Sequence, residues 1–124
     1  MPDKYPQLKI RNQDLLNPKY KLLFNKRLFN VVATVYQFVT QALSFGRDSA
    51  WKRKLIQCLP AMKNPQCLDL AFGTGDIACA LAEKYAGGSI IGLDINEKML
   101  TLAKTKSAFP NTRFVLGDMS HTGF

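Results

Sequence analysis

Glycines and acidic residues stand at the ends of three apolar segments in the second half of the chain. The first segment, in the stretch LDLAFGTGD, runs into a glycine turn at residues 73–75, and the next two end at Asp94 and Asp118. A glycine turn lets the backbone approach a ligand closely, and carboxylates accept hydrogen bonds from hydroxyl groups or attract a positive charge. The pattern therefore indicates a small-molecule site.

The segments that carry these residues alternate between strand and helix patterns. We expect strands at 67–72, 89–94 and 112–118, with helices at 76–88 and 96–109 between them. Such alternation predicts a parallel sheet with right-handed crossovers, whose ligands bind at the carboxyl ends of the strands. The glycine turn, Asp94 and Asp118 would then share one edge of the sheet.

The residues before this α/β pattern have the periodicity of helices and not of strands. Apolar residues recur every three or four positions from Lys19 to Phe45, which predicts one or two amphipathic helices ending at Gly46. A further helix is expected from Ala50 to Leu59, capped by Asp48 or Ser49. The chain would thus consist of three parts: a polar, proline-containing arm at 1–18, a helical region at 19–66 and an α/β domain at 67–124.

Positive charge is concentrated in the first half of the chain. Residues 1–66 hold twelve Lys or Arg against three Asp, while residues 67–124 hold five against six acids. A basic half is compatible with nucleic acid, an anionic membrane surface or a solvated helix face. The pattern predicts that the aromatic side chains are buried and not interleaved with the charges, which argues against nucleic acid.

Cysteine usage and the N-terminus indicate a cytoplasmic protein. Cys58, Cys67 and Cys79 form no CxxC pair, so the sequence predicts neither a disulfide framework nor a metal site. The first ten residues carry charge and proline where a signal peptide needs an apolar stretch. No apolar run is long enough to span a bilayer.

Two kinds of cofactor fit the glycine turn. Gly73, Gly75 and Ala78 satisfy the dinucleotide pattern G-x-G-x-x-G/A. However, a pyrophosphate prefers a helix N-terminus without negative charge, and here Asp76 begins the helix while Asp69 lies near the end of the first strand. S-adenosylmethionine has cationic sulfonium and amino groups and no phosphate, so it suits these acids better.

In this interpretation the acids have different partners on the cofactor. Asp94 would accept hydrogen bonds from the ribose hydroxyls, and Asp118 would lie near the adenine. The alternatives are that the glycines form only a tight turn and that Asp94 caps the following helix together with Glu97. His121 is the single histidine, and with no visible partner it is not assigned as a base. No catalytic residue is assigned.

Four stretches resemble one known family over most of residues 24–124: LDLAFGTGD, GLDINEKML, FNVVATVY and LSFGRDSAWKRKLI. They are similar to the ubiquinone/menaquinone biosynthesis C-methyltransferases, which are class I S-adenosylmethionine-dependent enzymes. The resemblance implies methyl transfer to a ring carbon of a lipophilic, polyprenylated quinol precursor. It also implies cofactor contacts at Thr74, Asp94, Asp118 and Met119. The chain departs from the family pattern at Gln37 and Thr40, near the expected acceptor, and at the bulky Phe72 in the turn.

The resemblance also predicts what lies around this part of the fold. Family members are roughly twice as long, and their Rossmann-like sheet has seven strands, so we expect N-terminal helices followed by the first three parallel strands. The first strand would lack a neighbour on one edge, which predicts either a homo-oligomer or aggregate joined there or a loosely packed monomer with little methyltransferase activity. The basic helices could rest on an anionic bilayer that holds the acceptor. A nucleic-acid or other small-molecule methyltransferase, or a non-catalytic binding module, remain the alternatives.

Overall fold

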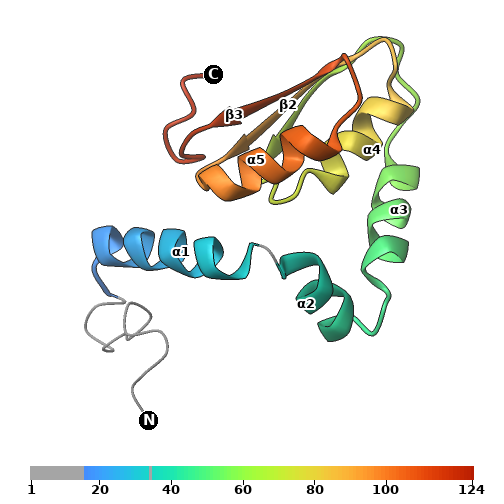
Figure 1. The fold of residues 1–124 in the computed structure, drawn as a ribbon. Coiled ribbons are helices and arrows are strands. Elements are labelled where there is room, and N and C mark those ends of the chain that lie inside the picture. The colour runs from blue at the N-terminus through green and yellow to red at the C-terminus, as the bar shows by residue number, and fades with distance from the viewer. Residues whose placement is uncertain (1–15, 34) are drawn as a thin grey trace.

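The computed structural model describes residues 16–33 and 35–124 (Figure 1). Most of the expected polar arm, residues 1–15, lies outside this description. The elements in chain order are α1 (Pro18–Val32), α2 (Tyr36–Leu43), α3 (Asp48–Cys58), β1 (Gln66–Leu70), α4 (Asp76–Lys84), β2 (Ser89–Asp94), α5 (Glu97–Lys106) and β3 (Thr112–Leu116). The predicted order of strands and helices is confirmed, and the predicted helical stretch before Gly46 consists of two helices.

The strands form a parallel sheet in the order β1-β2-β3. Helices α4 and α5 cover one of its faces (Figure 1). The core between them consists of Phe72, Ala78, Leu81, Ala82, Tyr85, Ile90, Ala103 and Phe114. On the opposite face Leu68 and Leu70 are each 44% exposed. This one-sided burial makes the α4–α5 face the hydrophobic core of the α/β part.

Strand β1 lies at the edge of the sheet. Within residues 16–33 and 35–124 it pairs only with β2, in a register that sets Leu68 opposite Ile91. The expected free edge is therefore present in the described part of the chain. Association of two copies through this edge stays a prediction.

Local hydrogen bonds set the ends of the N-terminal helices. The Asn17 side chain accepts from the backbone N–H of Lys19 and caps α1. Gly46, with φ of +74°, ends the turn after α2. The expectation that Asp48 or Ser49 caps α3 is wrong, because Asp48 is already the first helical residue and its N–H donates to the Ser44 hydroxyl at 3.1 Å.

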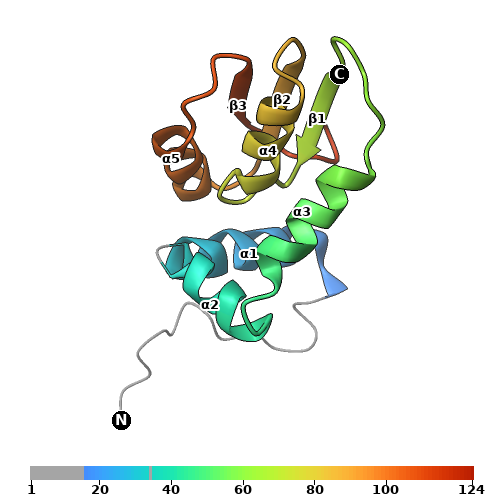
Figure 2. The same cartoon turned by 90° about the vertical axis from the view of Figure 1, so that its right-hand side faces the viewer.

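The side chains of Lys84, the last residue of α4, and of Tyr85, which follows it, bind α3 to the α/β part. The ammonium of Lys84 donates to the carbonyls of Ile56 and Leu59, at 2.7 and 2.8 Å. The Tyr85 hydroxyl donates to the carbonyl of Pro60 at 2.6 Å. These bonds join the last turn of α3 and the two residues after it to the end of α4. With α3 fixed in this way, α1 and α2 lie beyond the carboxyl ends of the strands (Figure 2).

Strand β1 is shorter than predicted. It ends at Leu70 because Ala71 adopts a positive φ of 56°, and the N–H groups of Ala71 and Phe72 both turn toward the carbonyl of Leu93. The turn directs Phe72 into the core, where its ring centroid lies 4.8 Å from that of Phe114. The bulky residue that departs from the family pattern is thus a core residue.

The N-terminal helices expose several apolar side chains. Phe38 and Trp51 are largely exposed, and Phe45 is 92% exposed. The prediction that the aromatic residues are buried is wrong for these positions, since the short helices α2 and α3 bury little of their surface. No helix in the described ranges is both long and apolar enough to cross a bilayer.

Gly75 and Gly46 both have a positive φ, but only Gly75 is packed against core side chains, so comparing alanine substitutions at the two positions tests the packing at Gly75. A Cβ at Gly75, whose φ is +83°, would lie 3.0 Å from both Ala103 and Phe114, whereas one at Gly46 would meet nothing within 4 Å. We expect Gly46→Ala to cost about 1 kcal/mol, from backbone strain alone. Gly75→Ala should cost about 2–4 kcal/mol, because overpacking adds to strain. Urea unfolding measures both, and equal losses would contradict this account of Gly75.

Candidate functional site

A cavity of about 280 Å³ lies at the carboxyl ends of the strands. We call it the sheet-edge cavity. From the sheet side it is lined by Ala71, Gly73, Leu93, Asp94, Ile95, Met99, Gly117, Asp118 and Met119. From α1 and α2 it is lined by Leu22, Asn25, Phe29 and Tyr36. Gly73, Asp94, Asp118 and Met119, which the sequence singles out from distant positions, are thus brought together.

Asp94 connects the glycine turn to the start of α5. Its side chain is nearly buried, with 9% exposure of the residue. One carboxylate oxygen accepts from the N–H of Gly73 at 2.8 Å, and the other accepts from the N–H of Asn96 at 2.9 Å. A carboxylate offers about four acceptor positions, so further positions remain for a ligand.

Asn96, and not Asp94, caps α5. The Asn96 side chain accepts from the N–H of Met99 at 3.1 Å, which is the geometry of an N-cap. The alternative interpretation of Asp94 as a cap acting with Glu97 is therefore wrong. Asp94 instead accepts hydrogen bonds from two backbone segments that border the cavity, the turn at Gly73 and the loop at Asn96.

The residues of the turn face different surroundings. A Cβ at Gly73, whose φ is +60°, would point toward the Tyr36 ring at 4.0 Å, across the cavity. Gly75 faces the core, so packing already requires a glycine there. Thr74 is buried, and its hydroxyl donates to Asp76 at 3.4 Å. Only Gly73 of this turn lines the cavity, and the contribution of Thr74 and Gly75 to cofactor binding stays a prediction.

Asp69 of β1 is an acid in an unfavourable environment. Burial raises the pKa of its carboxyl group, a hydrogen bond from the backbone of Ala78 lowers it, and the nearby charge of Asp94 raises it, with a net upward shift. Within the described part of the chain, its Oδ2 atom is buried without a hydrogen-bond partner. A buried, unpaired carboxylate oxygen destabilises the fold unless a cation or donor approaches it. Asp69 does not itself line the sheet-edge cavity.

Asp118 has a local partner that the sequence did not suggest. It accepts from the backbone N–H of Ser120 at 2.9 Å and from the Ser120 hydroxyl, and these bonds together with His121 lower the pKa of its carboxyl group. The Nδ1 atom of His121 lies 3.8 Å from Asp118. The expectation that His121 has no partner is therefore wrong. Its side chain is 85% exposed, so it faces mainly solvent.

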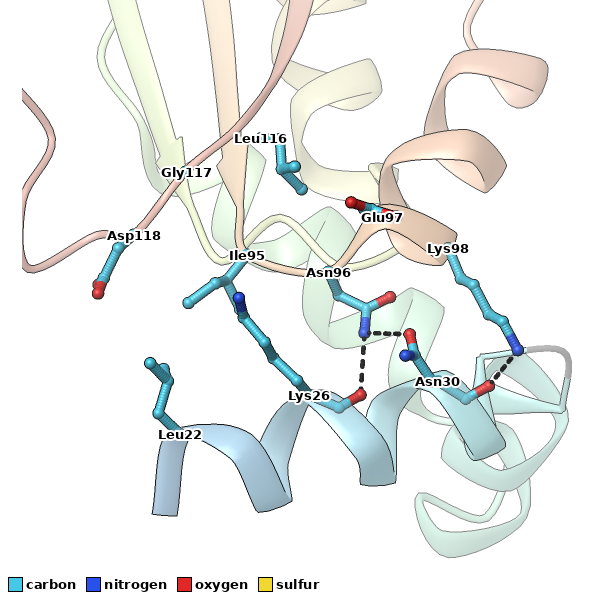
Figure 3. Close-up of a pocket in the computed structure, with 10 residues that line it drawn as sticks. All are labelled: Leu22, Lys26, Asn30, Ile95, Asn96, Glu97, Lys98, Leu116, Gly117 and Asp118. Atoms are coloured by element: carbon cyan, nitrogen blue, oxygen red, sulfur yellow. Dashed lines mark hydrogen bonds between the residues drawn. The ribbon is translucent and has the colours of Figure 1, made fainter. Parts of the chain in front are cut away.

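A second cavity, of about 570 Å³, adjoins the first between α1 and the start of α5 (Figure 3). Both share Leu22, Ile95, Gly117 and Asp118 in their linings. Across this gap the amide of Asn96 donates to the side chain of Asn30 at 2.9 Å, and Lys98 donates to the carbonyl of Asn30 at 2.9 Å (Figure 3). These bonds attach α1 to the sheet edge.

The sequence predicts that Gln37 and Thr40, which lie in α2, are near the acceptor, but it predicts packing for the aromatic residues of α1 and α2 and does not assign Phe29 or Tyr36 to a cavity. Leu22, Asn25 and Phe29 follow one another at three and four residues, so they share one face of α1. That spacing alone also describes a core-facing stripe. Nothing in it indicates that a cavity, and not a packed sheet, lies opposite.

Comparison with solved structures shows which proteins share this fold. A TehB-like S-adenosylmethionine-dependent methyltransferase from Corynebacterium glutamicum matches with a TM-score of 0.54 and 23% sequence identity. The match covers 74% of this chain and 48% of that one. The chain shares its fold with about half of that methyltransferase.

The family can be stated more narrowly. The model of the ubiE/COQ5 methyltransferase family matches residues 18–121, and the chain belongs to this family. It is 35% identical over 98 residues to the demethylmenaquinone methyltransferase of Thermotoga maritima, a match that covers 79% of this chain and 42% of that protein. It is also 35% identical over 82 residues to the ubiquinone/menaquinone biosynthesis C-methyltransferase UbiE of Geobacter sulfurreducens, with coverages of 65% and 32%. The chain spans about two fifths of the length of the first of these relatives.

The raised pKa of Asp69 leads to a stability prediction. The folded chain favours the protonated form, so the contribution of Asp69 to stability is present below its ordinary pKa of 3.8 and is lost as the pH rises through the folded-state value. At pH 7 we expect Asp69→Asn to raise the melting temperature by a few degrees, with a smaller gain as the pH falls toward 4.

The matched control is Asp118→Asn. The pKa of Asp118 is shifted downward by hydrogen bonds to its charged form, so the same substitution there removes favourable contacts. Thermal unfolding followed by circular dichroism should show no gain for this variant at pH 7. If the melting temperature of Asp69→Asn at pH 7 is equal to or lower than that of the unaltered chain, the environment of Asp69 is not unfavourable and this account is contradicted.

Proposed function

We propose that this chain is the cofactor-binding part of an S-adenosylmethionine-dependent methyltransferase that acts on a ring carbon of a lipophilic quinol precursor. The observation that carries the proposal is the Asp94 carboxylate, which lines a cavity beside the glycine turn in a chain of the ubiE/COQ5 family. The activity of a complete enzyme also depends on regions of the longer relatives that this chain does not match.

The residues present fit a cationic cofactor. Asp94 and Asp118 line the cavity, and Asp69 nearby has a buried oxygen without a partner among the described residues. Three carboxylates attract a sulfonium and an ammonium group and repel the pyrophosphate of a dinucleotide. This balance of charge favours S-adenosylmethionine over NAD.

Each predicted contact has a physical basis in the geometry. Asp94 keeps acceptor positions that suit the ribose hydroxyls, because its bonds to Gly73 and Asn96 use only part of its capacity. Met119 and Asp118 also line the cavity, and the adenine would lie beside them. The backbone at Gly73 can approach the ligand because no Cβ occupies the cavity there. Thr74 and Gly75 would act through the shape of the turn.

The cofactor, when bound, supplies an electrophilic methyl group. The residues of this chain would position it and keep water away, which are the main requirements for attack by an electron-rich ring carbon. Helices α1 and α2 close the cavity on the side away from the sheet with Leu22, Phe29 and Tyr36. This apolar lining suits a lipophilic quinol, the class of acceptor that the names of the relatives suggest.

Cofactor binding tests the proposal directly. In calorimetry we expect S-adenosylmethionine, and not NAD, to bind the chain. Asp94→Asn should weaken binding by about 1–3 kcal/mol, the scale of a hydrogen bond to a charged group. Glu83→Gln, an equal loss of charge at an exposed position of α4, is the control and should leave affinity unchanged. Binding of NAD alone, or full affinity in a folded Asp94→Asn variant, would contradict the assignment.

We also propose that the N-terminal helices contact an anionic bilayer, from which a lipophilic acceptor would arrive. Residues 16–59 carry eight Lys or Arg and one acid. On α1, the exposed Tyr20 and Leu23 lie among Lys19, Lys21 and Arg27. Exposed apolar side chains among basic ones are typical of helices that lie in a membrane interface.

Sedimentation with lipid vesicles measures this contact. We expect binding to vesicles that contain phosphatidylserine and much weaker binding to pure phosphatidylcholine. Charge reversal at Lys21 and Arg27 should weaken binding at least tenfold, since each basic residue near the surface contributes about 1 kcal/mol. Charge reversal at Lys63 and Lys104, outside α1 to α3, is the matched control. Equal loss in both double variants would indicate only a general effect of net charge.

A further inference from the structure

Four charged residues from three helices meet at the start of α4. The ammonium of Lys52 on α3 lies 2.7 Å from Asp48 on the same helix and 2.8 Å from Asp76, the first residue of α4. Lys106 on α5 pairs with the other carboxylate oxygen of Asp76. We call these residues the four-charge cluster. None of them lines either cavity at the sheet edge.

The cluster is connected to the glycine turn through Asp76. Asp76 follows Gly75 directly, and the hydroxyl of Thr74 donates to the same Asp76 oxygen that Lys52 contacts. A hydroxyl that donates to a carboxylate presents its own lone pairs to the other side. The position of the Asp76 carboxylate therefore affects how Thr74 and the turn face a ligand.

The charges of the cluster cancel. Burial raises the pKa of Asp76, but the hydrogen bonds that it accepts from Lys106 and Lys52 lower this pKa by more. The net shift is downward, so Asp76 is charged at neutral pH. Two carboxylates and two ammonium groups then sum to zero. Without Lys52, the same place would carry one uncompensated negative charge next to the turn.

We propose that Lys52 is a positioning residue for the cofactor, acting through Asp76 on the glycine turn. This inference rests on the proposed function. S-adenosylmethionine and S-adenosylhomocysteine each carry one carboxylate, at the amino-acid end. A surplus negative charge beside the turn repels that carboxylate, and Lys52 removes the surplus. Asp69 and Asp94 already attract the cationic groups of the ligand. A further negative charge at Asp76 is therefore of no use for binding unless a lysine compensates it.

A pair of ligands separates this role from general stabilisation. S-adenosylhomocysteine carries the amino-acid end, whereas 5′-methylthioadenosine has the same nucleoside and thioether without it. In calorimetry on this chain, we expect Lys52→Met to weaken binding of S-adenosylhomocysteine roughly tenfold, since a unit charge several ångströms away acts on that scale. Binding of 5′-methylthioadenosine should change less than twofold.

Three further variants sharpen the test. Lys52→Arg keeps the positive charge and should restore most of the affinity. Lys52→Met combined with Asp76→Asn removes one charge of each sign, so it should bind S-adenosylhomocysteine more tightly than Lys52→Met alone. Lys54→Met is the control, because Lys54 is exposed on the same helix, and it should behave as the unaltered chain.

The outcomes distinguish failure of this inference from failure of the proposed function. If the unaltered chain binds neither ligand, the proposed cofactor is wrong. If it binds both, and Lys52→Met weakens both equally or neither, Lys52 has only a structural role and the inference is overturned. Failure of Asp76→Asn to improve the Lys52→Met variant would also overturn it, since the effect would then not pass through Asp76.

Discussion

The two hydrogen bonds that the Asp94 carboxylate accepts join parts of the chain that the sequence separates by more than twenty residues. The bond from Gly73 fixes the turn after β1, and the bond from Asn96 fixes the loop into α5. Asn96 in turn caps α5 and donates to Asn30 on α1. One acid at the end of β2 therefore links the turn to the loop before α5 directly and to α1 through Asn96, while Lys98 attaches α1 independently.

Much of the α/β part could be predicted from the sequence, because its information is local. Apolar segments of strand length alternate with helical patterns, and β2 has the predicted limits at Ser89 and Asp94. The ends of β1 and α3 could not be predicted in the same way. Ala71 takes a positive φ where the turn donates to Leu93 on the neighbouring strand, and Asp48 begins α3 where its N–H donates to the Ser44 hydroxyl, so both ends involve contacts that local patterns do not show.

The site could be predicted only in part, for a related reason. Parallel topology places the ends of β1, β2 and β3 at one edge, so the glycine turn, Asp94 and Asp118 could be grouped from their positions in the sequence. The opposite wall depends on where α1 and α2 lie, which is decided by contacts such as Asn96 with Asn30. Residues of that wall, including Phe29 and Tyr36, have the same spacing as core residues, so their pattern alone could not assign them to a cavity.

Two acidic residues near the glycine turn, Asp69 and Asp76, lie in opposite electrostatic environments. Asp69 keeps a buried oxygen without a partner among the described residues, which costs stability in the ligand-free chain. Asp76, at the other end of the same turn, has an ammonium group on each oxygen. A fold selected for stability alone would gain from replacing Asp69 and would need no lysine from α3 beside Asp76. The contrast between the two acids supports the proposal that this turn attracts the cationic groups of a zwitterionic ligand without repelling its carboxylate.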